Sequence, residues 1–181
     1  RIIAGRLGGR RLRVPGEGTR PTSDRVRESV FNILAARSDL DGLWVLDLYA
    51  GSGALGLEAI SRGAAGATFV DSGRRAAVTI SANVRACGVA PNATVHTRTV
   101  SAYLAGAAER RFGLVFSDPP YDLRADRITA DLELLRSHLD DDALIVVERS
   151  TRSTGEIWPS EYEVVVDKSY GDTRVEIARL V

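Results

Sequence analysis

The stretch from Leu43 to Gly56 restricts the possible folds of this chain more than any other. It begins with an apolar run through Leu48, passes through a turn that contains Gly51 and Gly53, and continues as a predicted helix to about residue 62. A buried strand, a glycine-rich turn and a helix are typical of the first unit of a doubly wound α/β sheet. Because ligands bind such sheets at the carboxyl ends of the strands, the turn predicts a ligand site.

The glycine-rich turn allows two interpretations. Residues 51–56 read G-S-G-A-L-G, and Asp71 follows Gly51 by 20 residues, as in dinucleotide-binding oxidoreductases. However, Asp47 lies inside the apolar strand, where an unsatisfied carboxylate is costly, and hydride transfer gives it no purpose. The ammonium group of S-adenosylmethionine would supply a partner for that carboxylate. This second interpretation predicts a cofactor site made of Asp47, Tyr49, Ala50, Gly51, Gly53 and Asp71, although Asp71 is also suited to capping a helix that begins near residue 72.

A second candidate site follows the apolar run at residues 113–116, where the sequence reads Asp118, Pro119, Pro120 and Tyr121. Two successive prolines have no N–H to donate, so the chain must leave the sheet at this point. The Asp118 carboxylate and a backbone carbonyl of the Pro-Pro segment can accept hydrogen bonds from a planar –NH₂ group, while Tyr121 stacks on the ring that carries it. A plain strand-ending turn is the alternative interpretation of the same four residues.

The rest of the chain alternates between strand and helix patterns. A helix capped by Thr22 or Ser23 is predicted to run to about residue 37, and further helices are predicted at 74–87, 103–108 and 128–139. Further strands are predicted at 67–70, 93–96, 112–116 and 143–148, with 140–142 as a solvated loop. Residues 161–168 and 173–181 alternate like a closing antiparallel hairpin. The predicted fold is a Rossmann-like, doubly wound α/β protein with a mixed sheet of seven strands whose last strand is antiparallel.

The N-terminal segment is strongly basic although the whole chain has no net charge. Residues 1–37 contain nine arginines and three acids, which leaves +6 there and −6 on the remainder. Short strand-like runs at 2–4 and 11–14 predict a β-hairpin arm over residues 1–18, followed by the main domain at 19–181. A basic arm on an acidic body indicates contact with phosphate groups, and the candidate RNA-binding residues are Arg6, Arg10, Arg11, Arg13, Arg20 and Arg25.

Other classes of protein are disfavoured by composition. No apolar run approaches the roughly 18 residues of a membrane span, and the Arg-rich first residues do not resemble a signal peptide. The single cysteine, Cys87, fits a reducing compartment, so a cytoplasmic location is expected. Two isolated histidines, His96 and His138, predict no metal site.

With both motifs placed, the chain resembles the RsmD family of 16S rRNA guanine-N2 methyltransferases, which are class I S-adenosylmethionine-dependent enzymes. The resemblance runs nearly end to end and rests on residues 1–5, 19–28, 47–56 and 118–121. It implies that the site at 47–71 binds the cofactor, that residues 118–121 hold the target base, and that the partner is 16S rRNA, in a 30S subunit or an assembly intermediate. A monomer is expected.

One departure from related methyltransferases lies after the third strand. Where such enzymes often place an acidic or amide residue against the adenine, this chain has Arg98, Thr99, Val100 and Ser101. Three alternatives to guanine methylation remain open: methylation of adenine N6 in DNA or of a glutamine amide, which could use a similar pocket; a nicotinamide-dependent oxidoreductase; and a non-catalytic RNA-binding protein.

Overall fold

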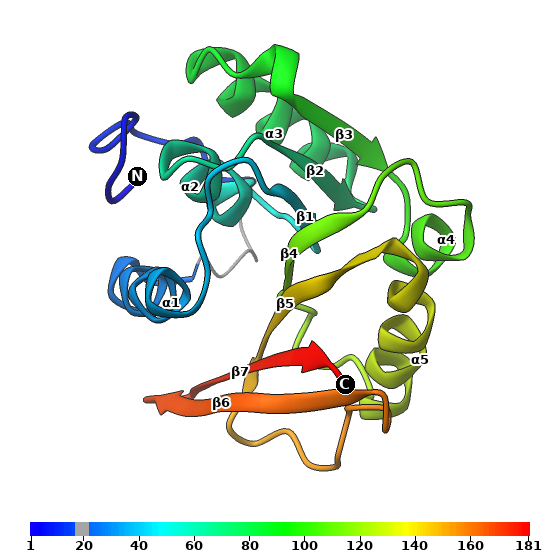
Figure 1. Ribbon diagram of the computed structural model, residues 1–181. Helices are drawn as coiled ribbons and strands as arrows, with labels where there is room; N and C mark the ends of the chain where they lie inside the picture. The colour runs from blue at the N-terminus through cyan, green and yellow to red at the C-terminus, as the bar shows by residue number, and fades with distance from the viewer. Residues whose placement is uncertain (17–21) are drawn as a thin grey trace.

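The computed structural model describes residues 1–16 and 22–181 of the chain. Seven strands form one mixed sheet (Figure 1). In spatial order they are β3 (Ala93–Thr97), β2 (Gly66–Asp71), β1 (Trp44–Leu48), β4 (Phe112–Ser117), β5 (Leu139–Ser150), β7 (Thr173–Leu180) and β6 (Tyr162–Tyr170). The first five run parallel to one another, and β7 is antiparallel to both β5 and β6. The predicted seven-stranded mixed sheet is therefore confirmed.

Helices cover both faces of this sheet (Figure 1). The helices α1 (Asp24–Arg37), α2 (Ala54–Ser61) and α3 (Arg74–Ala86) pack on one face, and α4 (Val100–Ala105) and α5 (Ala125–Leu135) pack on the other. Two short 3₁₀ helices, η1 (Ala90–Asn92) and η2 (Arg136–His138), precede β3 and β5. Since the chain turns outward from β1 to β3 and then returns to β4, the strand order reverses between β1 and β4. Doubly wound sheets bind ligands at such a point.

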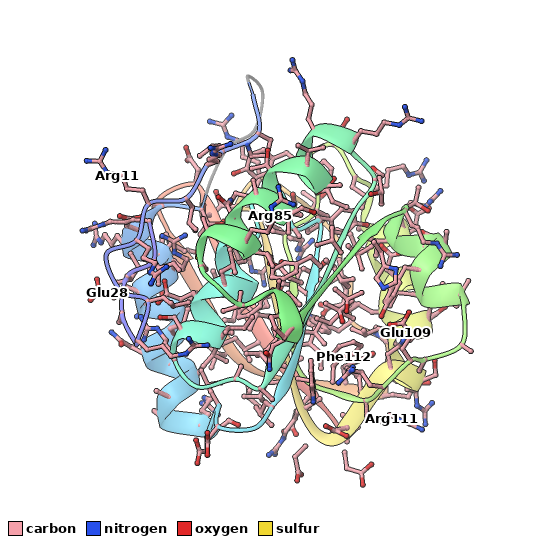
Figure 2. All side chains as sticks on the ribbon, turned by 90° about the horizontal axis from the view of Figure 1, so that it is seen from above. Arg11, Glu28, Arg85, Glu109, Arg111 and Phe112 are labelled. Carbon is pink, nitrogen blue, oxygen red and sulfur yellow. The ribbon has the colours of Figure 1, made fainter. Side chains whose placement is uncertain are left out.

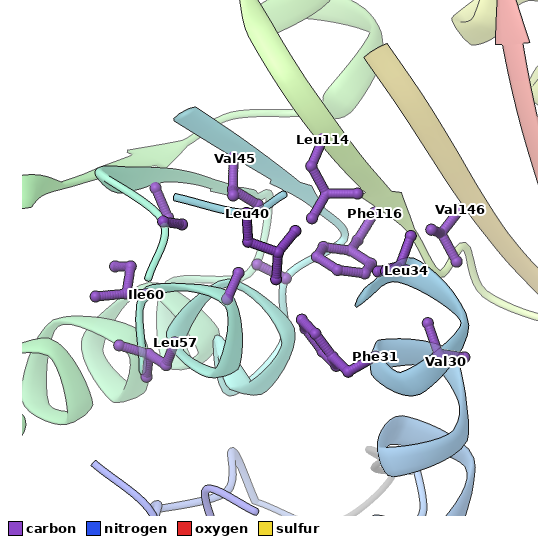
Figure 3. Close-up of a cluster of buried hydrophobic side chains, with 14 of the residues drawn as sticks. Val30, Phe31, Leu34, Leu40, Val45, Leu57, Ile60, Leu114, Phe116 and Val146 are labelled. Carbon is purple, nitrogen blue, oxygen red and sulfur yellow. The ribbon is translucent and has the colours of Figure 1, made fainter. Parts of the chain in front are cut away.

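The alternation of side chains along each strand divides the core into two layers. Val45 of β1 faces α1 and α2, whereas the next residue, Leu46, faces α4 and α5. In the first layer, Val30, Phe31 and Leu34 of α1 point toward Phe116 (Figure 3), and the Phe31 and Phe116 ring centroids are 5.5 Å apart. These contacts hold α1 against β4 close to the start of the Asp-Pro-Pro-Tyr motif.

The N-terminal segment differs from the predicted β-hairpin. No strand forms within described residues 1–16. The segment contains turns, and between the two predicted halves of the hairpin only Ile2 makes backbone hydrogen bonds, with Gly9 and Arg10. The reason is that α2 takes the backbone donors that a ladder would need. The Glu58 carboxylate accepts from the N–H groups of Ile3 (2.8 Å) and Ala4 (3.1 Å), and Ser61 accepts from Arg6 (2.9 Å) and Leu7 (2.9 Å).

This close approach to α2 also requires glycine at position 5. Gly5 has φ +80°, and a Cβ atom there would collide with the Ser61 carbonyl oxygen. We call residues 1–16 the arm. Its side chains Ile2 and Leu7 are buried with the core of the main domain.

Element boundaries elsewhere differ by a few residues from the sequence predictions. Residues 140–142, predicted as a loop, belong to β5 but are exposed. The irregular register between Phe112 and Leu114, where β4 meets β5, accommodates this polar start of the strand. The helix predicted at 103–108 begins earlier, at Val100, because Thr99 caps it by accepting from the Ala102 N–H (3.1 Å). In the described ranges, no helix is long and apolar enough to cross a membrane.

Candidate active site

A cleft of about 740 Å³ opens at the carboxyl ends of β1, β2, β4 and β5. It contains every candidate cofactor and catalytic residue except Gly53, together with residues from the arm, the start of α1 and the β6–β7 turn. The lining residues from the two candidate sites are Asp47, Tyr49, Ala50, Gly51, Asp71, Asp118, Pro119, Pro120 and Tyr121. The structure thus brings the glycine-rich turn and the Asp-Pro-Pro-Tyr motif into one cavity.

Asp47 is the most deeply buried acid in this cleft, with 1% of its surface exposed. One carboxylate oxygen accepts a hydrogen bond from the Gly56 N–H (2.9 Å), in the first turn of α2. Burial raises the pKa of Asp47 to about 8; the negative charge of Asp71 adds to the rise, and the Gly56 hydrogen bond opposes it. A cation placed beside this carboxylate would favour its charged form and lower its pKa.

The raised pKa of Asp47 predicts a pH-dependent stability. Between about pH 4 and pH 8 the folded protein holds a proton that the unfolded chain releases, so the unfolding free energy falls as pH rises through this window. The Asp47→Asn variant keeps an oxygen that can accept from the Gly56 N–H, and its side chain does not ionise. Its unfolding free energy therefore does not fall in this way as pH rises. We expect the ligand-free variant to be about 2–3 kcal/mol more stable than the parent at pH 8.5, with the difference shrinking toward pH 4.

Urea unfolding at pH 4.5 and pH 8.5 measures this difference. The exposed Asp140→Asn variant serves as the control and should follow the parent at both pH values. A constant difference between Asp47→Asn and the parent across the pH range would contradict the assignment.

The turn after β1 has an uncommon backbone. Tyr49 is the sole non-glycine residue with positive φ in the described chain (φ 55°), and Gly51 and Gly53 follow at φ 60° and 81°. The Tyr49 hydroxyl donates to Asp131 of α5 (2.7 Å), which ties the turn to the opposite helical layer. Gly53 does not line the cleft. A Cβ atom there would lie 3.2 Å from the Phe69 ring, so this glycine permits packing of α2 on the sheet.

Asp71 lies at the end of β2, beside the glycine-rich turn. Its two carboxylate oxygens accept from the backbone N–H groups of Gly51 (3.0 Å) and Gly73 (2.8 Å). The second contact is the local capping-type bond that the sequence allowed, although the residue at the N-cap position of α3 is Gly73. Each oxygen has a further lone pair, so Asp71 can still accept from hydroxyl groups in the cleft.

Asp118 lies opposite these groups and next to a second acid, Glu148, at the carboxyl end of β5. The Thr22 hydroxyl, just before α1, lies 3.0 Å from a Glu148 oxygen and 3.4 Å from an Asp118 oxygen. Its single proton can serve one of them at a time. Burial, together with the charges of Glu148 and Asp47, raises the pKa of Asp118 well above its usual value.

The remaining residues of the motif lead outward from this acidic centre. Pro119 is buried and Pro120 is exposed, and the Tyr121 side chain is 48% exposed at the rim of the cleft. An aromatic ring in that position can stack on a planar group that enters the cavity. Thr99, Val100 and Ser101, the residues after β3, also line the cleft.

None of the five candidate RNA-binding arginines that the structure describes lines the cavity. Arg6, Arg10, Arg11, Arg13 and Arg25 are exposed, whereas Arg20 lies outside the described residues. Arg27, which also contributes to the basic count of the first 37 residues, has a structural position. It is 3% exposed and binds Asp24 (2.9 Å) and the Arg1 carbonyl, and its Nε lies 3.8 Å from Glu58.

Comparisons with known proteins show where this chain belongs. The family model described as "Conserved hypothetical protein 95" matches residues 1–179. "Ribosomal RNA small subunit methyltransferase D" of Escherichia coli is 39% identical over 94% of this chain and 85% of that protein. The chain belongs to the RsmD family. The match spans the arm, the glycine-rich turn and the Asp-Pro-Pro-Tyr motif, as the resemblance in the sequence predicted.

Further RsmD proteins and solved structures agree with this placement. The Haemophilus influenzae "Ribosomal RNA small subunit methyltransferase D" is 32% identical over 94% of this chain and 89% of that protein. The solved structure of yhhF from Escherichia coli superposes with a TM-score of 0.85 at 37% identity and covers 99% of this chain and 97% of that chain. The fold of this RsmD-family chain is thus shared over its whole length.

Glu148 and Thr22 line the cleft but are not among the predicted site residues. Glu148 carried a usable signal, since it ends an apolar strand in the same way that Asp71 and Asp118 follow theirs. Thr22 was considered as a helix cap, but Ser23 caps α1 and Thr22 points to the two acids instead. Among described residues, no group of three or more His, Cys, Asp or Glu side chains could hold a metal ion.

Proposed function

We propose that this chain transfers a methyl group from S-adenosylmethionine to the exocyclic N2 of a guanine in small-subunit ribosomal RNA. One observation carries the proposal: the glycine-rich turn and the Asp-Pro-Pro-Tyr motif line a single cleft. Membership in the RsmD family favours the methyl-donor interpretation of the turn over the nicotinamide one. The proposed partner is 16S rRNA, within a 30S subunit or an assembly intermediate, and a monomer acting in the cytoplasm remains our expectation.

The chemistry of the donor set fits this cofactor. Asp47 is a buried carboxylate with one backbone donor on it, and it would accept from the amino-acid ammonium group. Asp71 would accept from the ribose hydroxyls, while Tyr49, Ala50 and Gly51 form the backbone wall beside them. S-adenosylmethionine would supply an electrophilic methyl group on its sulfonium.

The Asp-Pro-Pro-Tyr motif would hold the target base. A guanine N2 lone pair is delocalised into the ring, so the nitrogen attacks well only when its two N–H groups are held out of conjugation. Asp118 and the Pro119 carbonyl would accept those two N–H groups, and Tyr121 would stack on the ring. Rate enhancement would then come mostly from positioning and electrostatics.

The reaction releases a proton, and accepting it would be a second role of Asp118. As the N–C bond forms and the S–C bond breaks, the nitrogen becomes positively charged and must lose one proton. A carboxylate whose pKa is raised by burial and by Glu148 is a suitable acceptor for it. The base must leave its stack to reach Asp118, which a guanine in an RNA loop does at modest cost.

Incubation with methyl-labelled donor tests the proposal. We expect label in 16S rRNA, supplied naked or as 30S particles, and N2-methylguanosine after nuclease digestion. Plasmid DNA and total protein from the same cells serve as competing substrates. Label that appears only in DNA or protein would show that the same pocket serves adenine N6 or a glutamine amide, and tight RNA binding without transfer would indicate a non-catalytic protein.

A further inference from the structure

A group of exposed arginines lies on α3, next to the arm. Three arginines and no acid occur in the 13 residues of this helix, and all three arginines are exposed. Among the described residues, neither they nor Arg6, Arg10, Arg11 and Arg13 of the arm form an ion pair with a carboxylate, whereas Arg1 pairs with Asp24. We call these side chains the arm–α3 surface: Arg10, Arg11 and Arg13 of the arm, and Arg74, Arg75 and Arg85 of α3.

The arm lies directly along α3, so the two sets of arginines are continuous. The Arg10 guanidinium donates to the Ala86 carbonyl at the end of the helix (2.9 Å). The Asn83 side chain bonds both the N–H (2.8 Å) and the carbonyl (3.0 Å) of Arg13. Near the start of α3, Arg75 Nη1 lies 3.1 Å from where a Cβ of Gly16 would be. Arm and helix therefore run in opposite directions, side by side.

The arm and α3, the two parts of this surface, both lead to the cleft. Val14 and Pro15 of the arm line the cavity, and so do Asp71 and Ser72, which lie two to three residues before Arg74. Figure 2 shows Arg11 pointing away from the body at its outer edge and Arg85 on α3. A nucleic-acid strand bound along the arm or along α3 would therefore reach the cavity.

The positive charge of this surface indicates that it binds a polyanion. Residues 38–181 carry −6, yet α3 has a charge of +3. Arginine binds phosphate with two parallel N–H donors, and arginines without a carboxylate partner break no ion pair when they do so. The large apolar side chains exposed here are Val14 and Val78, too few for the apolar centre of a protein interface.

We propose that the arm and α3 together bind the phosphate backbone of the RNA that flanks the target base, with the α3 arginines contributing as much as the arm. This inference rests on the proposed function for its substrate. Because phosphate contacts position a strand without touching the reacting atoms, the surface should govern RNA affinity and leave the chemical step unchanged.

The double variant Arg75→Glu/Arg85→Glu tests the surface. We expect its KM for the RNA substrate to rise about tenfold or more at 0.1 M salt, with kcat and the dissociation constant of S-adenosylhomocysteine within about twofold of the parent. The matched control is Arg136→Glu/Arg179→Glu, which makes the same change in net charge at η2 and β7, where both arginines are exposed and paired.

The salt dependence of RNA binding gives an independent readout. For Arg75→Gln/Arg85→Gln, binding to naked 16S rRNA should show a log–log slope against salt that is smaller by about one for each phosphate contact removed. An equal rise of KM in the control would overturn the proposal. So would a loss seen only with 30S particles, because that result would place a ribosomal protein on the surface.

The two proposals fail in different ways. If the parent methylates no RNA, the proposed function is wrong, and direct RNA binding still tests the surface. If the parent methylates RNA and the α3 variants keep parental KM and salt slope, only the surface is wrong.

Discussion

An Asp118→Ala protein is expected to bind S-adenosylhomocysteine like the parent and to transfer methyl groups about 10²–10³ times more slowly. The variant removes one of the two acceptors proposed to hold the target –NH₂ group, and mutations of such positioning groups typically have this effect on kcat. Single-turnover methylation of the RNA substrate measures the rate, and calorimetry measures cofactor-product binding.

Stability separates this loss from a folding defect. The charge of Asp118 is disfavoured in the folded protein by burial and by Glu148 and Asp47, so Asp118→Ala should not lower the melting temperature above neutral pH. Asp122→Ala, an exposed acid just beyond the motif, is the control for rate. A rate for Asp118→Ala within tenfold of the parent would show that the motif is not the centre of the chemistry.

The largest stability effect is expected from Glu58→Ala, with a loss of about 3–5 kcal/mol in the unfolding free energy. Glu58 is fully buried, binds the Arg62 guanidinium (2.9 Å), and accepts from two backbone N–H groups of the arm. Its removal also deprives buried Arg27 of a neighbouring negative charge. Chemical denaturation measures the loss.

Limited proteolysis distinguishes release of the arm from global unfolding. Trypsin should cut Glu58→Ala first at the arm arginines, before the body, because the arm loses its anchor on α2. Glu58→Gln keeps one acceptor and should be intermediate, which preserves the test if the alanine variant does not fold. Glu133→Ala, an exposed acid on α5, should match the parent. A loss below about 1 kcal/mol in Glu58→Ala would refute the anchoring role.

Much of the fold was predictable because its signals are local. Apolar runs, turn glycines and helix periodicity act over a few residues, and they located all five parallel strands and the closing antiparallel pair. The arm was mispredicted because the donors of its backbone are taken by Glu58 and Ser61, about 55 residues away. Alternation of residue types could not reveal those partners.

Within α1, helical periodicity separates a buried arginine from an exposed one. Arg27 lies four residues before Phe31 and seven before Leu34, so helical periodicity places it on the buried stripe. Arg25 lies off this stripe and is exposed. A basic count that treats the two arginines alike therefore overstates the charge that is available to RNA.

The sequence by itself determined that an acid ends or interrupts each of three apolar strands and that a glycine-rich turn follows the first. Because parallel strands share a carboxyl edge, these acids and the turn lie at one edge of the sheet. Only the tertiary structure decided which groups meet there: Thr22 reaches Glu148 across 126 residues, and the arm lies along α3. The physical reason is that the residue types within a short segment decide whether it forms a strand. The order of the strands and the positions of the helices on the sheet depend instead on packing the whole core.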